Sequence, residues 1–257
     1  MAEFDPEELR KQVNKSRFPF QLKVTHQIKS TQSQHHWTVE SPEHSWADSE
    51  SGKQGFIDLV LAHENSSGLK IIIECKRPLG GRWIFLVDRT PKQQSRIRTF
   101  WVRGDNPPKS GWDDLPFQPV SLESSDCVVV GQNERSPLLE NLAGGLLQSV
   151  NGVSDQAQII FERERREPLR IFIPAIVTAA EMFVCYVDPA SEISIDGALD
   201  KSATFEPINF IRFRKSLATR LNRRSVPQNL REENLDKERS VLIFNANSWW
   251  THLEGSH

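Results

Sequence analysis

Three ionisable residues interrupt two of the most apolar segments of the chain. Asp58 lies in the apolar run 55–61, and Glu74 and Lys76 lie at the end of the run 69–76. A short polar segment separates the two runs, as in a β-hairpin. Burying a charge costs free energy unless the charge is paired or binds a metal ion. These side chains therefore mark a candidate site, and the chemistry we expect there is the binding of a divalent metal ion.

The two runs predict antiparallel strands on which the two carboxylates meet. Side chains alternate faces along a strand, so Glu74 and Lys76 share one face. A hairpin centred near Ser66 brings Asp58 opposite Glu74, with their Cβ atoms roughly 4.5–5.5 Å apart. Two carboxylates at that separation favour a hard cation such as Mg²⁺, which keeps waters that a phosphate can replace. We expect the Lys76 ammonium to lie beside the metal-bound water.

The segments Gly55-Phe56-Ile57-Asp58 and Glu74-Cys75-Lys76 resemble the motif of the PD-(D/E)xK nucleases, the restriction-endonuclease-like superfamily. The resemblance covers residues 37–77 and implies an α/β fold in which helices flank a mixed central β-sheet. It implies Mg²⁺-dependent hydrolysis of phosphodiester bonds, with Mn²⁺ as a possible substitute. Asp58, Glu74 and Lys76 would be the catalytic residues. Asp58, Glu74 and the carbonyl oxygen of Cys75 would bind the metal, and Lys76 would orient or activate the attacking water.

Two positions depart from the pattern of this family. Ile57 stands where many members have proline, and the predicted helix at 19–32 contains no acidic residue. Many members use an acid from that helix at a second metal position. Glu40 and Glu8 are the alternatives that the sequence offers for this ligand.

Basic residues gather in two further segments. Residues 88–119 are rich in Pro, Gly, Arg and Trp. We expect an irregular insertion there that binds a nucleic-acid strand and contains a short helix at 92–101. Residues 212–224 contain six basic residues and no acid. An exposed basic face and a phosphate-binding surface fit this second segment equally well. The predicted nucleic-acid contacts are Arg77, Arg82, Arg96, Arg212, Arg214 and Lys215.

Composition bounds the class of protein. The chain has 257 residues and a formal net charge of −2, which excludes a binder that is basic overall but allows a local basic face. Its three cysteines show no paired spacing, which favours reduced core residues and a cytoplasmic location. The sequence has no apolar run of membrane-spanning length, so we expect no membrane association. We expect one domain over residues 1–252, and residues 253–257 are similar to a cloning scar.

The remaining elements follow from local patterns. Asp5-Pro6 predicts the start of a helix, and Phe20, Val24 and Ile28 form the apolar stripe of the helix at 19–32. A polar loop is expected after a first strand at 35–40. A further helix is expected from Ser136-Pro137, and further strands at 83–87, 126–130, 171–177, 182–187, 210–215 and 241–244.

These patterns together predict a Mg²⁺-dependent endodeoxyribonuclease, and family analogy gives it a role in defence, restriction or repair. One alternative is a non-catalytic module of the same fold that binds nucleic acid or a protein. Another is a structural subunit whose Trp-rich loops dock onto a larger complex, and a homodimer is a further possibility. The simplest interpretation of the motif is an ion pair on an exposed strand, which needs no function.

Overall fold

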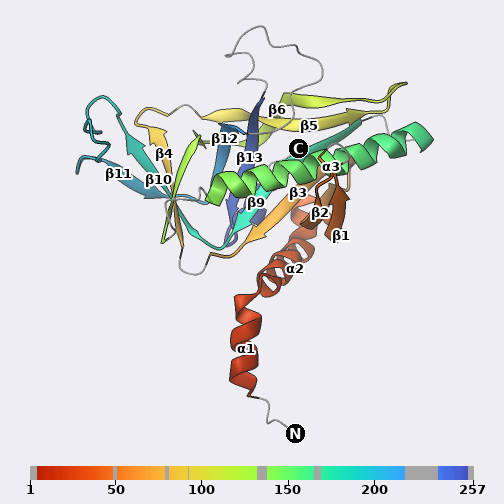
Figure 1. Ribbon diagram of the computed structural model, residues 1–257, viewed down its shortest axis with the longest axis horizontal. Helices are drawn as coiled ribbons and strands as arrows, with labels where there is room; N and C mark the ends of the chain where they lie inside the picture. The colour runs from red at the N-terminus through yellow and green to blue at the C-terminus, as the bar shows by residue number, and fades with distance from the viewer. Residues whose placement is uncertain are drawn as a thin grey trace.

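The protein is described here by a computed structural model, which defines residues 5–48, 51–78, 81–91, 93–131, 138–164, 169–217 and 237–253. Within these ranges it is a mixed α/β protein with two β-sheets and three α-helices (Figure 1). The helices are α1 (Pro6–Lys15), α2 (Phe18–His35) and α3 (Leu138–Glu164), and a 3₁₀ turn, η1 (Trp249–His252), follows the last strand. No helix in the described ranges is long and apolar enough to cross a membrane.

The larger sheet contains nine strands and the smaller one four. The strands of the larger sheet are β1 (Trp37–Ala47), β2 (Gln54–His63), β3 (Ser66–Lys76), β5 (Gln94–Arg103), β6 (Lys109–Ser121), β7 (Glu123–Ser124), β9 (Leu169–Thr178), β12 (Phe210–Ser216) and β13 (Glu238–Asn245). The strands of the smaller sheet are β4 (Arg82–Asp88), β8 (Asp126–Val130), β10 (Glu181–Val187) and β11 (Thr204–Pro207).

Strand β9 lies at the centre of the larger sheet, whose order is β1-β2-β3-β9-β13-β12-β7. It pairs in parallel with β3 and β13, whereas β1, β2 and β3 pair antiparallel, so the sheet is mixed. Residues 172–178 of β9 are buried without interruption. This is the pattern of a strand covered on both faces, as its apolar sequence predicts.

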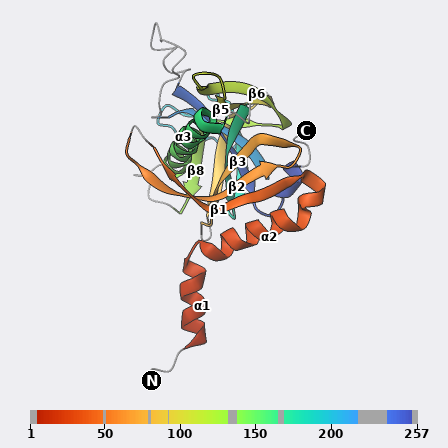
Figure 2. The same cartoon turned by 90° about the vertical axis from the view of Figure 1, so that its right-hand side faces the viewer.

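Helices α2 and α3 cover opposite faces of this sheet. Val24 and Ile28 of α2 pack in one core cluster with Ile73 of β3, and Leu147 of α3 packs in the other cluster with Ile72. The neighbouring isoleucines separate because strand side chains alternate between faces. Helix α1 has no buried residue and projects away from the body (Figures 1 and 2).

The predicted start of the first helix is confirmed, whereas Ser136 and Pro137, the predicted start of a later helix, lie outside the described residues. The Asp5 side chain accepts the backbone N–H of Glu7 at 2.9 Å, and Pro6 is the first residue of α1. Such a cap satisfies one of the free N–H groups of the first turn. In α2 the stripe Phe20, Val24 and Ile28 is buried as predicted.

The prediction for residues 88–119 is wrong in its secondary structure. Strands β5 and β6 form a hairpin in which Arg103 pairs with Lys109, and no helix forms in the part of 92–101 that the structure describes. Strand β5 also pairs with β9, through Phe100 and Phe172. Because this pairing buries the apolar residues of β5, tertiary contacts outweigh the irregular composition of the segment.

Two further boundaries differ from prediction. Strand β1 continues to Ala47, and its Trp46 packs against Gly152 of α3, so the segment after residue 40 is ordered strand and not a polar loop. Leu253 is buried in the core cluster under α2 and belongs to the fold. Residues 254–257 of the predicted cloning scar lie outside the described residues, as do Arg220, Arg223 and Arg224 of the predicted basic run.

Candidate active site

The β2–β3 hairpin has the predicted register, and its ladder ends at the candidate site. Leu59 pairs with Ile73, and the next pair in this register would be Asp58 with Glu74. This next pair does not form, and Leu59–Ile73 is the last pair of the ladder. Instead, the Oδ2 atom of Asp58 accepts the backbone N–H of Cys75 at 2.8 Å. A side-chain oxygen therefore takes the place of a backbone acceptor, which fixes the carboxylate against β3.

The Asp58 carboxylate is fully buried, and helix α2 holds both its side chain and its backbone. Gln21 donates its Nε2–H to the Asp58 carbonyl oxygen at 2.9 Å, and an Arg17 guanidinium nitrogen lies 3.3 Å from Asp58 Oδ1. That Oδ1 atom accepts no hydrogen bond within the described residues. Burial raises the pKa of Asp58, although the Cys75 N–H and the Arg17 charge act in the opposite direction.

Glu74 and Lys76 lie on the same face of β3 as Ile72, the face that α3 covers. Both side chains are partly buried near the end of the strand. Burial, and then the charge of Asp58, raise the pKa of Glu74 to about 7, and the cations Arg17 and Lys76 oppose this rise. Glu74 therefore holds its proton to a higher pH than an ordinary glutamate, and a cation beside it would favour its ionised form.

Glu43 is an acidic neighbour that the sequence did not identify. Its flanking residues Pro42 and His44 pair with Leu59 and Ile57, so Glu43 lies opposite Asp58. Its charge contributes to the raised pKa of Asp58. The sequence pattern predicts a polar loop at Glu43, and a residue in a loop has no predictable strand partner.

The backbone of Glu43 is strained. Its φ of 49° lies in the left-handed region, which L-residues other than Asn and Asp rarely adopt. Strain of this kind costs on the order of 1–3 kcal/mol and is concentrated at functional sites. The outlier therefore adds a separate reason to include Glu43 in the candidate site.

The structure does not bring Glu40 or Glu8 to this site. Glu40 forms an ion pair with Lys70 at 2.7 Å, further along the hairpin. Glu8 accepts a hydrogen bond from Gln12 on the exposed surface of α1. Of the acids considered, only Glu43 lies opposite Asp58.

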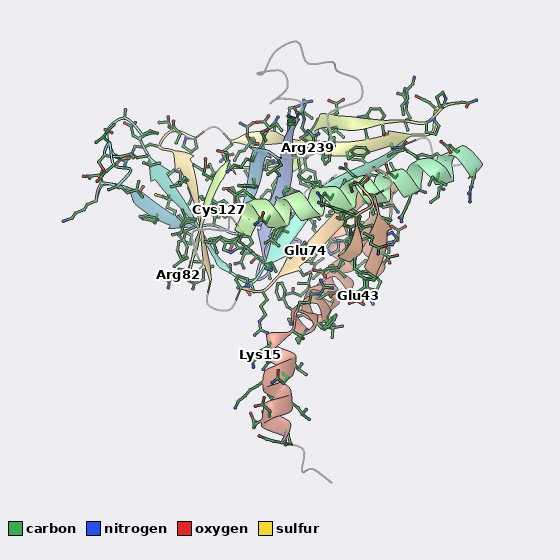
Figure 3. The ribbon with its side chains drawn as sticks, viewed as in Figure 1. Lys15, Glu43, Glu74, Arg82, Cys127 and Arg239 are labelled. Carbon is green, nitrogen blue, oxygen red and sulfur yellow. The ribbon has the colours of Figure 1, made fainter. Side chains whose placement is uncertain are left out.

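Several cations gather where α1 meets α2. Arg77 follows β3 and donates to the carbonyl oxygen of Asn14 at 3.0 Å, which ties the end of α1 to the site. Lys15 is exposed next to Asn14 (Figure 3), and Arg17 is the N-cap residue of α2. With Lys76, these side chains form a group of cations, which we name the junction cations: Lys15, Arg17, Lys76 and Arg77.

Arg212 lies in the core instead of on a basic face. Its side chain is 0% exposed and donates to Ser121 Oγ at 2.6 Å and to the carbonyl oxygens of Phe117 and Pro119 at 2.8 Å. Burial lowers its pKa to about 10. The predicted phosphate contact of Arg212 is therefore corrected, because a buried guanidinium that binds β6 cannot reach a surface ligand.

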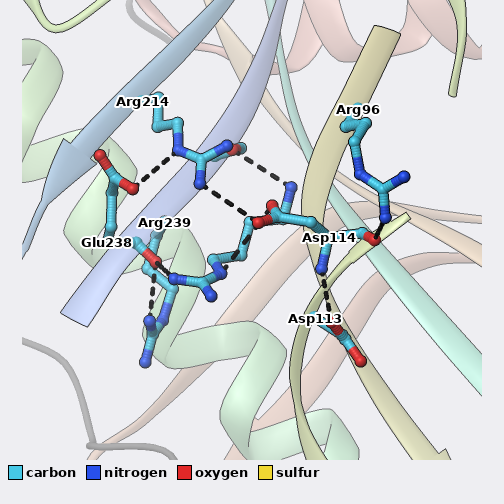
Figure 4. Close-up of polar contacts among 8 residues, drawn as sticks. Arg96, Asp113, Asp114, Arg214, Glu238 and Arg239 are labelled. Atoms are coloured by element: carbon cyan, nitrogen blue, oxygen red, sulfur yellow. Dashed lines mark hydrogen bonds and ion pairs between the residues drawn. The ribbon is translucent and has the colours of Figure 1, made fainter. Parts of the chain in front are cut away.

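The neighbouring basic residues are compensated by acids. Arg214 lies 2.9 Å from Glu238 and 3.3 Å from Asp114, and Arg96 donates to the Asp114 carbonyl oxygen (Figure 4). Lys215 pairs with Glu140 and Asp126, and Arg82 pairs with Glu181. Of the six predicted nucleic-acid contacts, Arg77 alone belongs to the junction cations.

Mg²⁺ is the metal that the motif implies, and the oxygen atoms of Asp58 and Glu74 are its candidate ligands. Among the described residues, no group of three or more His, Cys, Asp or Glu side chains is arranged to hold a metal ion. Asp58 and Glu74 still supply hard oxygen donors, and the buried Asp58 Oδ1 lacks a hydrogen-bond donor. Mg²⁺ keeps several of its waters and needs only one or two protein carboxylates, so this pair fits it.

Fold and site together define a mixed α/β protein in which a buried Asp58 and a partly buried Glu74 lie at the end of a hairpin next to its central strand. Comparison of the chain with protein-family models, with curated proteins and with solved structures gave no match.

Proposed function

We propose that this protein is a Mg²⁺-dependent nuclease of restriction-endonuclease-like fold that hydrolyses phosphodiester bonds in DNA. The observation that supports this best is the meeting of Asp58 and Glu74 at the end of the β2–β3 hairpin, with Lys76 on the face of Glu74. A mixed central sheet between α2 and α3 agrees with the same class. A role in defence, restriction or repair is part of this proposal.

Each residue of the site has a distinct role in this proposal. Asp58 and Glu74 would hold the ion, joined by the carbonyl oxygen of Cys75, which faces β2 like the N–H that binds Asp58. When bound, Mg²⁺ stabilises negative charge on the phosphate. The Lys76 ammonium would orient the attacking water and stabilise the charge that develops on the phosphate oxygens. Glu43, opposite Asp58, would add negative charge near the ion without being one of its ligands.

The junction cations are the proposed contacts for the DNA backbone. The charges of Arg17 and Lys76 act on Asp58 and Glu74, and Arg77 follows Lys76 in the chain, whereas Arg214 and Lys215 already neutralise acids of this chain. Phosphate contacts position a nucleic acid without reading its sequence. Near the site these cations can place a phosphate beside Lys76, which a distant basic surface could not do.

The test is cleavage of plasmid DNA by the purified protein with Mg²⁺ or Mn²⁺. We expect nicking or degradation that Lys76→Ala abolishes while Mn²⁺ binding to Asp58 and Glu74 persists. Arg82→Ala is the matched control, because Arg82 is an exposed cation that pairs with Glu181. Cleavage that persists in Lys76→Ala would contradict the proposal.

A non-catalytic DNA-binding module of the same fold is the second candidate. The observation that favours it is the Arg17–Asp58 contact, which already supplies a cation to the buried carboxylate. Such a module would bind DNA and leave it intact with every divalent ion, and its DNA affinity would be unaffected by Asp58→Asn.

A further inference from the structure

Arg17 is the cation closest to the buried acid of the site. Its guanidinium lies 3.3 Å from Asp58 Oδ1, the atom that accepts no hydrogen bond among the described residues. The charge of Arg17 also acts on Glu74. Arg17 thus lies where it partly neutralises the two carboxylates to which the proposed function assigns the metal.

The contact has the features of a loose ion pair. The Arg17 side chain is 46% exposed while that of Asp58 is 0% exposed, and the two form an ion pair without hydrogen-bond geometry. An exposed partner can leave at little cost, because water replaces the contact that it loses. The Asp58 side chain cannot follow, since the Cys75 N–H holds its other oxygen.

We propose that Arg17 is an internal counter-cation of the metal site, which a divalent ion displaces from Asp58 when it binds. This inference rests on the proposed function, because it needs a metal at Asp58 and Glu74. A guanidinium and a divalent ion at one buried carboxylate oxygen repel each other, so the two compete for Asp58. The guanidinium, whose side chain is 46% exposed, then moves outward into solvent.

The experiment is a calorimetric titration of Mn²⁺ into the wild type and three variants. Arg17→Gln removes the competing charge and should bind Mn²⁺ about 10-fold more tightly. Arg17→Lys keeps the charge and should remain close to wild type. Arg10→Gln is the matched control, because Arg10 pairs with Glu7 on the exposed surface of α1, and it should bind like wild type. Equal or weaker binding by Arg17→Gln would overturn the inference.

A measurement on the wild type keeps the test valid if Arg17→Gln does not fold. With ¹⁵N-labelled arginine, the side-chain Nε signal of Arg17, assigned by its loss in Arg17→Lys, should shift on addition of Mg²⁺. The signal of Arg10 should stay in place. A wild type that binds Mg²⁺ without a shift of Arg17 contradicts this inference alone. Binding of no ion by wild type and Arg17→Gln contradicts the proposed function as well.

Discussion

The buried carboxylate of Asp58 accepts the backbone N–H of Cys75 at 2.8 Å, at the point where the ladder between β2 and β3 ends. One oxygen of this acid therefore serves the fold, and the other faces Arg17. The same side chain positions the Glu74-Cys75-Lys76 segment and, in the proposed function, would supply a donor atom to the metal ion. The structural role of Asp58 and its proposed role in metal binding can be separated experimentally, because Oδ2 serves the first and Oδ1 the second.

Substitutions of Asp58 should separate these two roles. Asp58→Asn keeps an acceptor for the Cys75 N–H, so we expect near wild-type stability with loss of Mn²⁺ binding and of cleavage. Asp58→Ala leaves that buried N–H without a partner, which costs about 1–3 kcal/mol in the free energy of unfolding. Urea denaturation of both variants measures the difference. Equal stability of the two would show that the Asp58–Cys75 contact contributes little.

Glu74 should make the metal-free protein less stable as the pH rises. Its pKa is raised from 4.5 to about 7 in the folded state, so between these values the unfolded chain has already lost a proton that the folded chain keeps. The contribution of Glu74 to the free energy of unfolding is therefore fully present below pH 4.5, and it is lost as the pH rises through about 7.

Glu74→Gln should therefore be more stable than wild type above pH 7, by on the order of 1–3 kcal/mol. The measurement is the free energy of unfolding from pH 5 to pH 8 without metal. Glu181→Gln, an exposed acid paired with Arg82, is the control and should follow wild type. If the free energy of unfolding depends on pH in the same way for wild type and Glu74→Gln, the raised pKa of Glu74 is refuted. With saturating Mg²⁺, wild type should become the more stable of the two proteins.

Glu43 should strengthen metal binding without stabilising the fold. It is exposed and lies opposite Asp58, so Glu43→Gln removes one negative charge near the ion and should weaken Mn²⁺ binding about 3- to 10-fold. Because φ of Glu43 is 49°, Glu43→Gly should weaken metal binding equally while relieving backbone strain. Titration calorimetry and thermal unfolding check the two effects. Unchanged Mn²⁺ affinity in both variants would exclude Glu43 from the site.

The junction cations should carry the affinity for DNA. The double variant Lys15→Gln/Arg77→Gln should bind DNA more weakly and with a shallower dependence on salt, because each lost phosphate contact reduces the number of released counterions. Arg82→Gln/Lys215→Gln, in which both cations pair with acids of this chain, is the matched control. Fluorescence anisotropy at several salt concentrations measures both. An equal loss in the control pair would show that the DNA surface extends away from the α1–α2 junction.

An element of the fold can be predicted when the residues that stabilise it are close to one another in the sequence. The capped start of α1 and the register of β2 against β3 at Leu59 and Ile73 follow from neighbouring residues, and both are predicted correctly. The turn itself lies at residues 64–65 and not at Ser66, and a register shift at Ala62 accommodates it. The β5–β6 hairpin is missed because its apolar residues are buried by β9, about 70 residues further along the chain. A composition rich in Pro, Gly and Arg gives no sign of that partner.

By itself the sequence determined that Asp58 and Glu74 share the end of one hairpin, because strand alternation and a short turn are local properties. Only the tertiary structure decided which other charges join them. Arg17 and Glu43 come to Asp58 from α2 and β1, and Arg212 is buried by acceptors on β6, 91 to 95 residues away. The environment of a charge depends on partners that the fold brings together, and no local pattern records them.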